Sequence, residues 1–202
     1  MDKTLMQQLE FLKIADELKS VYRATVLVNQ SRQENVAEHS WHTALMAMTL
    51  FEHAEVEGIS LPRVLKMILV HDLVEIYAGD TPAFAGVNPE EKAKQEQESA
   101  DKLFATLPAH QAQEYRRLWE EFDRMDTPDS LYAGALDRFS SFLANHLTDG
   151  HSWNKYQVTT NLVYKRIEPV KEIMPKLWEF VEMAIRQGVE KGYIKEGIQN
   201  ES

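Results

Sequence analysis

The sequence predicts an all-α fold, a single helical bundle, and three observations support this prediction. Apolar residues recur at spacings of three and four along most of the 202-residue chain, as in helices with one buried face. Capping residues and prolines mark several helix starts. No segment alternates apolar and polar residues for long enough to predict a useful strand. Because no repeat or linker-like tract divides the chain, we expect residues 1–202 to form one domain.

Three helices are expected within the first 79 residues of the chain. The first covers residues 5–18, and its apolar stripe consists of Leu5, Leu9, Phe11, Leu12, Ala15 and Leu18. The second covers about residues 36–57 and is followed by Gly58, a common residue after a helix end. A third helix is expected from Ser60 to about Ala78, with Gly79 just past its end.

The second half of the chain is also expected to be helical. Residues 88–91, Asn-Pro-Glu-Glu, combine a capping residue with proline at the first helical position, which is a strong start signal. Residues 80–87 before it are expected to form a loop. Further helices are expected over residues 89–106, 109–124, 128–148 and 155–190, the last interrupted near Pro169 and Pro175.

The helix expected from Ser60 to about Ala78 carries polar residues within an apolar sequence. His71, Asp72 and Glu75 lie within four residues of one another, so their side chains can share one sector of a helix. The surrounding residues are almost all apolar, which predicts a buried helix. Buried imidazoles and carboxylates need partners, and a metal ion is the simplest one. A hydrogen-bonded core cluster without a ligand is the alternative.

Two further residues complete a possible ligand set. His39 and Asp137 join His71 and Asp72 to give two imidazoles and two carboxylates. This mixture of nitrogen and oxygen donors suits a divalent cation such as Mn, Co, Zn or Fe, and a site with open positions could activate water. The chain has no cysteine, so thiolate ligands and disulfides are excluded. The sequence therefore predicts a metal-dependent hydrolase.

The charge and hydropathy of the chain limit its partners. A formal net charge of −10 argues against a general affinity for nucleic acid polymers, which need a basic surface. A small phosphorylated substrate remains compatible, because local charge governs such a site. No window is apolar enough to span a membrane, and residues 1–4 do not resemble the start of a signal peptide. We expect a cytoplasmic protein that does not bind membranes.

The ordered residues His39, His71-Asp72 and Asp137 resemble the HD-domain metal-dependent phosphohydrolase superfamily. Residues 34–40, Glu-Asn-Val-Ala-Glu-His-Ser, and residues 71–80, His-Asp-Leu-Val-Glu-Ile-Tyr-Ala-Gly-Asp, are similar to its bacterial 5'-deoxynucleotidase branch and eukaryotic relatives. The similarity covers about residues 8–185. It implies one HD domain, an all-helical bundle with the metal site between helices.

The resemblance also implies roles for individual residues. One divalent metal ion (Mn, Co, Mg, Zn or Fe) would be ligated by His39, His71, Asp72 and Asp137. Glu75 and Asp80 would be catalytic, and Arg23 would bind the substrate phosphate. The implied substrate is a small phosphomonoester, most simply a (deoxy)nucleoside 5'-monophosphate, hydrolysed by metal-activated water. A homodimer is expected from the same resemblance.

The chain departs from the deoxynucleotidase pattern at one position, because Ala24 replaces a tryptophan that lies near the sugar. The preference for deoxyribose over ribose is therefore open. Other readings are hydrolysis of a cyclic dinucleotide or an alarmone, or a regulatory module that binds metal or nucleotide without turnover. The alarmone reading is weakened by Ile76, since the alarmone hydrolase has an aspartate after the glutamate that matches Glu75. His42 could in principle ligate a metal, but the family pattern does not use this position.

Overall fold

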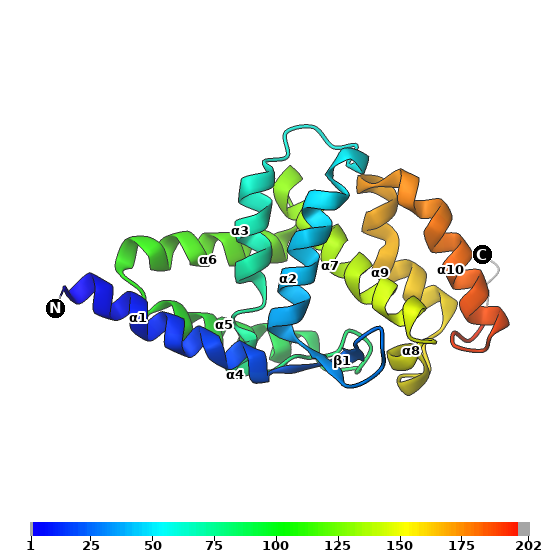
Figure 1. Ribbon diagram of the computed structural model, residues 1–202, viewed down its shortest axis with the longest axis horizontal. Helices are drawn as coiled ribbons and strands as arrows, with labels where there is room; N and C mark the ends of the chain where they lie inside the picture. The colour runs from blue at the N-terminus through cyan, green and yellow to red at the C-terminus, as the bar shows by residue number, and fades with distance from the viewer. Residues whose placement is uncertain (1, 198–202) are drawn as a thin grey trace.

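The computed structural model describes residues 2–197, and most of this range is helical (Figure 1). In chain order the elements, with η for 3₁₀ turns, are α1 (Lys3–Ala15), η1 (Asp16–Ser20), β1 (Tyr22–Val26), β2 (Gln33–Asn35), α2 (Val36–Thr49), η2 (Phe51–His53), α3 (Leu61–His71), α4 (Glu75–Ala78), α5 (Pro89–Phe104), α6 (Ala109–Arg124), α7 (Pro128–Leu147), α8 (His151–Lys155), α9 (Thr160–Ile173), η3 (Pro175–Leu177) and α10 (Trp178–Glu190). The expected all-α fold is confirmed, apart from one small sheet. Among the described residues, no helix combines the length and hydropathy needed to cross a bilayer.

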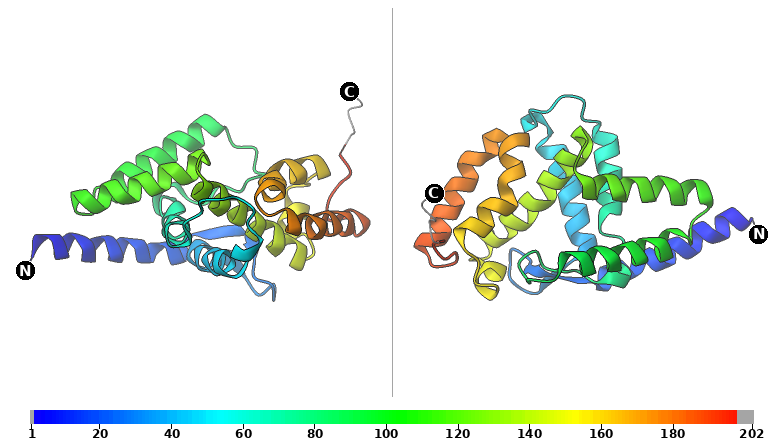
Figure 2. Two further views of the ribbon diagram at one scale, coloured as in Figure 1. Left: turned by 90° about the horizontal axis from the view of Figure 1, so that it is seen from above. Right: turned by 180° about the vertical axis from the view of Figure 1, so that it is seen from behind.

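Helix α7 is the central element of the fold. It packs against α2, α3, α6 and α9, and Figures 1 and 2 show it crossing the middle of the protein. Its inward side chains Tyr132 and Leu136 are fully buried. The hydroxyl of Tyr132 also donates a hydrogen bond to the carbonyl oxygen of Ala47 (2.9 Å), which ties α7 to α2. Burial of this kind supplies most of the stability of such a core.

A short antiparallel hairpin that the sequence did not predict precedes α2. Strands β1 and β2 pair with Tyr22 opposite Asn35 and Val26 opposite Gln33, with an irregularity between these pairs. The strands are too short for an alternating pattern to be recognised. Asn35 ends β2 and also caps α2, because its side chain accepts from the amide of Glu38 and the Glu38 side chain accepts from the amide of Asn35.

The helix expected from Ser60 to Ala78 is broken in the middle. Helix α3 ends at His71, and the four-residue α4 begins at Glu75. Between them the chain forms tight turns, in which the amide of Glu75 donates to the carbonyl oxygen of Asp72 (3.0 Å). The expectation that His71, Asp72 and Glu75 share one helical sector was therefore wrong. Asp72 occupies the C-cap position of α3 instead.

Other boundaries also differ from the expected ones. The helix expected over 36–57 ends at Thr49 and is followed by η2. The helix expected over 155–190 is divided into α9, η3 and α10, and α8 precedes it and ends at Lys155. Pro169 lies inside α9 without ending it, whereas Pro175 begins η3. Residues 80–87 form the expected loop.

Helix α1 extends past the body of the protein with its apolar stripe largely uncovered (Figure 2). Leu9 and Leu12 are 49% and 61% exposed, whereas Phe11 is buried edge-to-face against Tyr115 of α6. The side chain of Gln8 donates to that of Gln111 (2.8 Å). Thus α1 rests on α6 with one narrow face and presents most of the predicted stripe to solvent.

Candidate metal centre

Three elements bring the candidate ligands together. The capping box that begins α2 places His39 on the second turn of that helix. The end of α3 supplies His71 and Asp72, and the buried middle of α7 supplies Asp137. In an uninterrupted helix, adjacent residues point about 100° apart. Here α3 ends at His71 and Asp72 occupies the C-cap position, with Nε2 of His71 lying close to Oδ2 of Asp72.

The Nε2 atom of each histidine lies within 4 Å of a carboxylate oxygen of both aspartates. The Nε2 atom of His39 lies 3.0 Å from Oδ1 of Asp137 and 3.7 Å from Oδ2 of Asp72. The Nε2 atom of His71 lies 3.0 Å from Oδ2 of Asp72 and 3.9 Å from Oδ1 of Asp137. Ligand atoms of His39, His71 and Asp72 all lie within 4.8 Å of one another, a spacing that could hold a metal ion.

The orientation of His71 fits a metal ligand. Its Nδ1 atom lies 2.6 Å from the carbonyl oxygen of Ile68, which can only accept a hydrogen bond, so Nδ1 carries the hydrogen. In the neutral ring the lone pair is then on Nε2, the atom that faces the cluster. Although Nε2 lies close to Asp72, it is buried without a hydrogen bond of good geometry in the described part of the chain. A cation would satisfy this atom.

The charges of the cluster also favour the binding of a cation. Burial alone would lower the pKa of His71, but the carboxylates of Asp72 and Asp137 outweigh it and raise this pKa to about 10. Burial opposes ionisation of Asp72 and Asp137. Even so, His71 lowers the pKa of Asp72, and His39 and His71 hold the pKa of Asp137 well below its ordinary value. The ionised carboxylates therefore hold a proton on the imidazole in the absence of metal, and a divalent cation could replace that proton.

Glu75 and Asp80 lie at the edge of the cluster and line the same cavity. Glu75 is 8% exposed, and its Oε2 atom has no hydrogen-bond partner among residues 2–197. Burial and the negative charges of Asp72 and Asp80 raise its pKa to about 10. Burial also raises the pKa of Asp80, which follows Gly79 at a positive φ of 76°. Two carboxyl groups that hold protons more tightly than usual thus adjoin the candidate ligands.

Arg23 reaches the cluster from β1. Its Nη1 atom lies 3.4 Å from Oδ2 of Asp72 and 3.7 Å from Oδ1 of Asp80, and Nη2 donates to the hydroxyl of Ser141 (3.0 Å). Its Nε atom lies 3.5 Å from Oε2 of Glu34. Burial alone would lower the pKa of Arg23, but the negative charges of Asp72, Asp137 and Asp80 outweigh it and raise this pKa, which keeps the positive charge of Arg23 beside the cluster.

The cavity extends from this cluster along α7 toward α9. Sequence reasoning identified neither Arg138 nor Arg166, which both line it, because single arginines in helices have no diagnostic spacing. Arg166 of α9 donates to Oδ2 of Asp137 (3.4 Å). Ala24 also lines the cavity. His42 does not belong to the group of possible ligands found in the described range.

The fold and the centre together define a class of helical proteins in which two histidines and two aspartates could hold one metal ion. In this chain an arginine and two further carboxyl groups adjoin that centre. Comparison with known proteins identifies the family of the chain. Residues 15–178 match the HD domain, and the chain belongs to the HD-domain family.

Relatives of the chain support this assignment. A crystal structure from Magnetospirillum magnetotacticum, described as a predicted metal-dependent phosphohydrolase, is 38% identical, superposes with a TM-score of 0.89, and covers 95% of this chain and 96% of that one. A 5'-deoxynucleotidase from Dictyostelium discoideum is 32% identical over 67% of this chain and 74% of its own length. The human 5'-deoxynucleotidase is 29% identical over 67% of this chain, and the matched part is 65% of the human protein.

Proposed function

We propose that the protein is a metal-dependent phosphohydrolase that releases phosphate from a small phosphomonoester, most simply a (deoxy)nucleoside 5'-monophosphate. The observation that carries this proposal is the buried Nε2 atom of His71, which faces ionised Asp72 and Asp137 beside Arg23. The names of the relatives support the substrate class.

In this proposal His39, His71, Asp72 and Asp137 hold one divalent cation, with Mn, Co, Mg, Zn and Fe all compatible with the donor set. The bound ion would supply positive charge that activates water and neutralises the phosphate. Arg23 binds the phosphate through its planar guanidinium group. Since Arg23 contacts Asp72 and Asp80, it also fixes the phosphate next to the groups that exchange protons.

Glu75 and Asp80 move protons in the proposed reaction. Hydrolysis of an alkyl phosphate requires a proton for the departing alkoxide and removal of one from the attacking water. Glu75, whose raised pKa keeps it protonated near neutral pH, is assigned as the donor to the leaving oxygen. Asp80 is assigned as the group that accepts the proton of water. Ala24 leaves room beside the sugar, so we expect ribose as well as deoxyribose to be accepted.

The test is phosphate release from a panel of ribo- and deoxyribonucleoside 5'-monophosphates by metal-stripped protein supplied with Mn, Co, Mg, Zn or Fe. We expect release with at least one cation and its abolition in Asp72→Ala, while the circular dichroism spectrum stays helical. Activity retained by Asp72→Ala at full metal occupancy would contradict the assigned centre. Bound metal without hydrolysis of any phosphate ester would favour a regulatory module instead.

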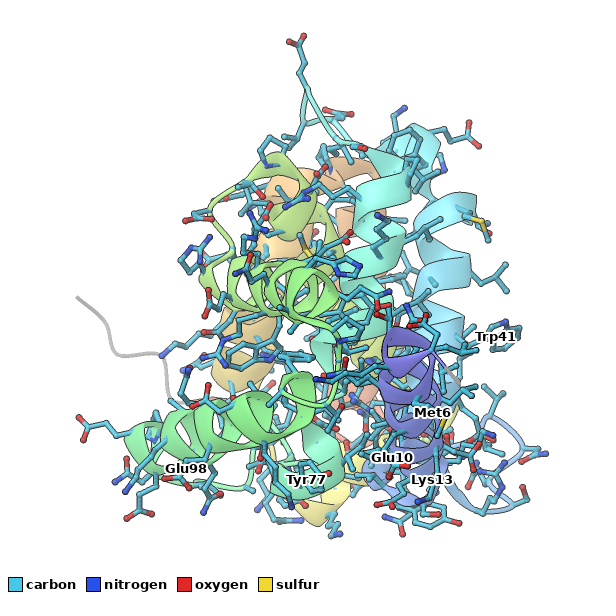
Figure 3. The ribbon with its side chains drawn as sticks, turned by 90° about the vertical axis from the view of Figure 1, so that its left-hand side faces the viewer. Met6, Glu10, Lys13, Trp41, Tyr77 and Glu98 are labelled. Carbon is cyan, nitrogen blue, oxygen red and sulfur yellow. The ribbon has the colours of Figure 1, made fainter. Side chains whose placement is uncertain are left out.

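We also propose that the protein is a homodimer, built on the apolar surface of α1 and α2. Exposed side chains of this surface are Leu5, Met6, Leu9, Leu12, Trp41, Leu45 and Met48. Figure 3 shows Met6 of α1 and Trp41 of α2 pointing away from the body of the protein. A second copy offers the same surface, as two-fold symmetry requires. Sedimentation at several concentrations tests this.

Two further expectations from the sequence stay predictions. We propose that residues 1–202 act as one HD domain, which cooperative unfolding in a single calorimetric transition would support. We also propose a cytoplasmic location, which cell fractionation would test.

A further inference from the structure

The cavity beside the metal centre has a basic end that the proposed reaction does not use. Arg138 of α7 and Arg166 of α9 both line it, and these two helices pack side by side (Figure 1). Asp137 lies between this end and the centre, because its Oδ1 atom faces His39 (3.0 Å) and its Oδ2 atom faces Arg166 (3.4 Å). The arginine pair therefore adjoins the candidate ligands on the far side of one carboxylate.

Arg138 differs from the other cations that line the cavity. Arg23 contacts Asp72, Asp80 and Glu34, Lys92 pairs with Glu96 (3.1 Å), and Arg166 pairs with Asp137. Arg138 has neither an ion-pair nor a hydrogen-bond partner in the described part of the chain, although it is partly buried and next to a second arginine. Burial and the positive charge of Arg166 both disfavour the charged form of this guanidinium group, and the neighbouring carboxylate of Asp137 offsets only part of that effect. An anionic ligand would supply the acceptor that the protein lacks.

The position of Arg138 suits one ligand that reaches both ends of the cavity. Arg138 lies three residues before Ser141, whose hydroxyl accepts a hydrogen bond from Arg23. Three residues advance a helix by about 4.5 Å, so the two arginine sites lie within roughly one turn of each other along α7. A small molecule bound at Arg23 can therefore extend to Arg138. The small side chain of Ala24 in the cavity wall leaves space for a substituent on the sugar.

We propose that Arg138 and Arg166 form a second anion-binding subsite, and that the preferred substrate is a phosphomonoester carrying a second phosphate group, as in a nucleoside 3',5'-bisphosphate. This inference rests on the proposed hydrolytic function and specifies its substrate class. Arg138 contacts the second phosphate, which remains on the product. Arg166 contributes charge while staying in contact with Asp137.

The experiment compares kcat/KM for adenosine 5'-monophosphate and adenosine 3',5'-bisphosphate in the metal-loaded protein. We expect the wild type to favour the bisphosphate by about tenfold or more, the size of one charge-assisted contact. Arg138→Gln should remove most of this preference through an increased KM for the bisphosphate. Arg138→Lys, which keeps the charge without the planar fork, should retain part of it. If Arg138→Gln does not fold, the lysine variant decides.

Lys165→Gln is the matched control, because Lys165 is an exposed cation on the same helix as Arg166. It should leave the preference unchanged. Two results would overturn the subsite: a wild type without preference for the bisphosphate, or an equal loss on both substrates in Arg138→Gln. The second result would mean that Arg138 acts on the phosphate that is cleaved.

Calorimetric binding separates the failure of the subsite from the failure of the proposed function. If no phosphate ester is hydrolysed but the bisphosphate binds the isolated protein in a manner that depends on Arg138, the subsite stands and the hydrolytic function falls. If monophosphates are hydrolysed and the bisphosphate binds no more tightly than they do, the function stands and the subsite falls.

Discussion

The metal centre and helix α1 depart from the usual distribution of side chains in opposite ways. At the centre, His39, His71 and Glu75 are 0%, 4% and 8% exposed, although all three are ionisable. On α1, Leu9 and Leu12 are about half exposed or more, although both are apolar. Both arrangements cost free energy in the isolated chain. Under the proposals above, the two regions therefore suit different partners: a small cation at the centre, and an apolar surface at α1.

Among variants that keep the proposed metal ligands, the largest effect should come from Glu75→Gln, which removes a proton from the centre without changing its shape. We expect kcat on nucleoside monophosphates to fall by about 10²–10⁴, the usual contribution of a general acid. The fall should be smaller on p-nitrophenyl phosphate, because its leaving group needs no proton. Steady-state assays on both substrates test this, and an equal fall on both would contradict the assigned donor role.

The same variant should stabilise the metal-free fold above pH 5. The pKa of Glu75 is raised from its ordinary value of 4.5 to about 10 in the folded protein, so between these values the unfolded chain loses the proton and the folded chain keeps it. Wild-type stability therefore falls as the pH rises through this window. Thermal melts should show a higher Tm for Glu75→Gln at pH 8 and nearly equal values at pH 4. A constant difference at all pH values would contradict the pKa.

Cation binding should stabilise the metal-stripped protein. A ligand at a hundred times its Kd adds about 2.7 kcal/mol, which corresponds to roughly 5–10 °C in Tm for a chain of this size. The increase should largely disappear in Asp72→Ala, since its carboxylate is part of the donor set. Differential scanning fluorimetry with each metal measures both proteins, and an undiminished increase in the variant would place the cation elsewhere.

The smallest effect on catalysis should follow a change in α1. Leu9→Glu should dissociate the homodimer in sedimentation experiments while kcat stays within about twofold, because Leu9 lies on the solvent face, away from the centre. Leu162→Glu on α9, where the leucine is 47% exposed, is the matched control and should leave the dimer intact. Dissociation by both variants, or by neither, would argue against an interface on α1.

Sequence reasoning predicted the helical fold well because helices of this length carry several turns of periodic pattern. It also selected the residues that meet at the centre, because His39, His71-Asp72 and Asp137 stand within recognisable motifs. The geometry that joins them was not predictable. Apolar residues continue through the break between α3 and α4, so nothing in the local pattern indicated that the helix ends at His71.

Three other features could not be derived from local pattern, for different reasons. The hairpin β1–β2 is shorter than the window over which an alternating pattern can be recognised. Arg138 and Arg166 lie 28 positions apart on two helices and meet only through the packing of α7 on α9. The exposure of the α1 stripe could not be predicted, because an amphipathic pattern shows that a face needs an apolar neighbour but not whether the same chain provides it.

The break after His71 has a consequence for reading other chains. Neighbouring side chains of a continuous helix diverge by about 100°, whereas here the helix ends at the histidine, and Nε2 of His71 lies 3.0 Å from Oδ2 of Asp72. In this chain the His-Asp pair therefore marks a helix boundary as well as the candidate metal centre. We expect that placing the same dipeptide in the middle of a straight designed helix would reproduce the sequence but not the directions of the two side chains.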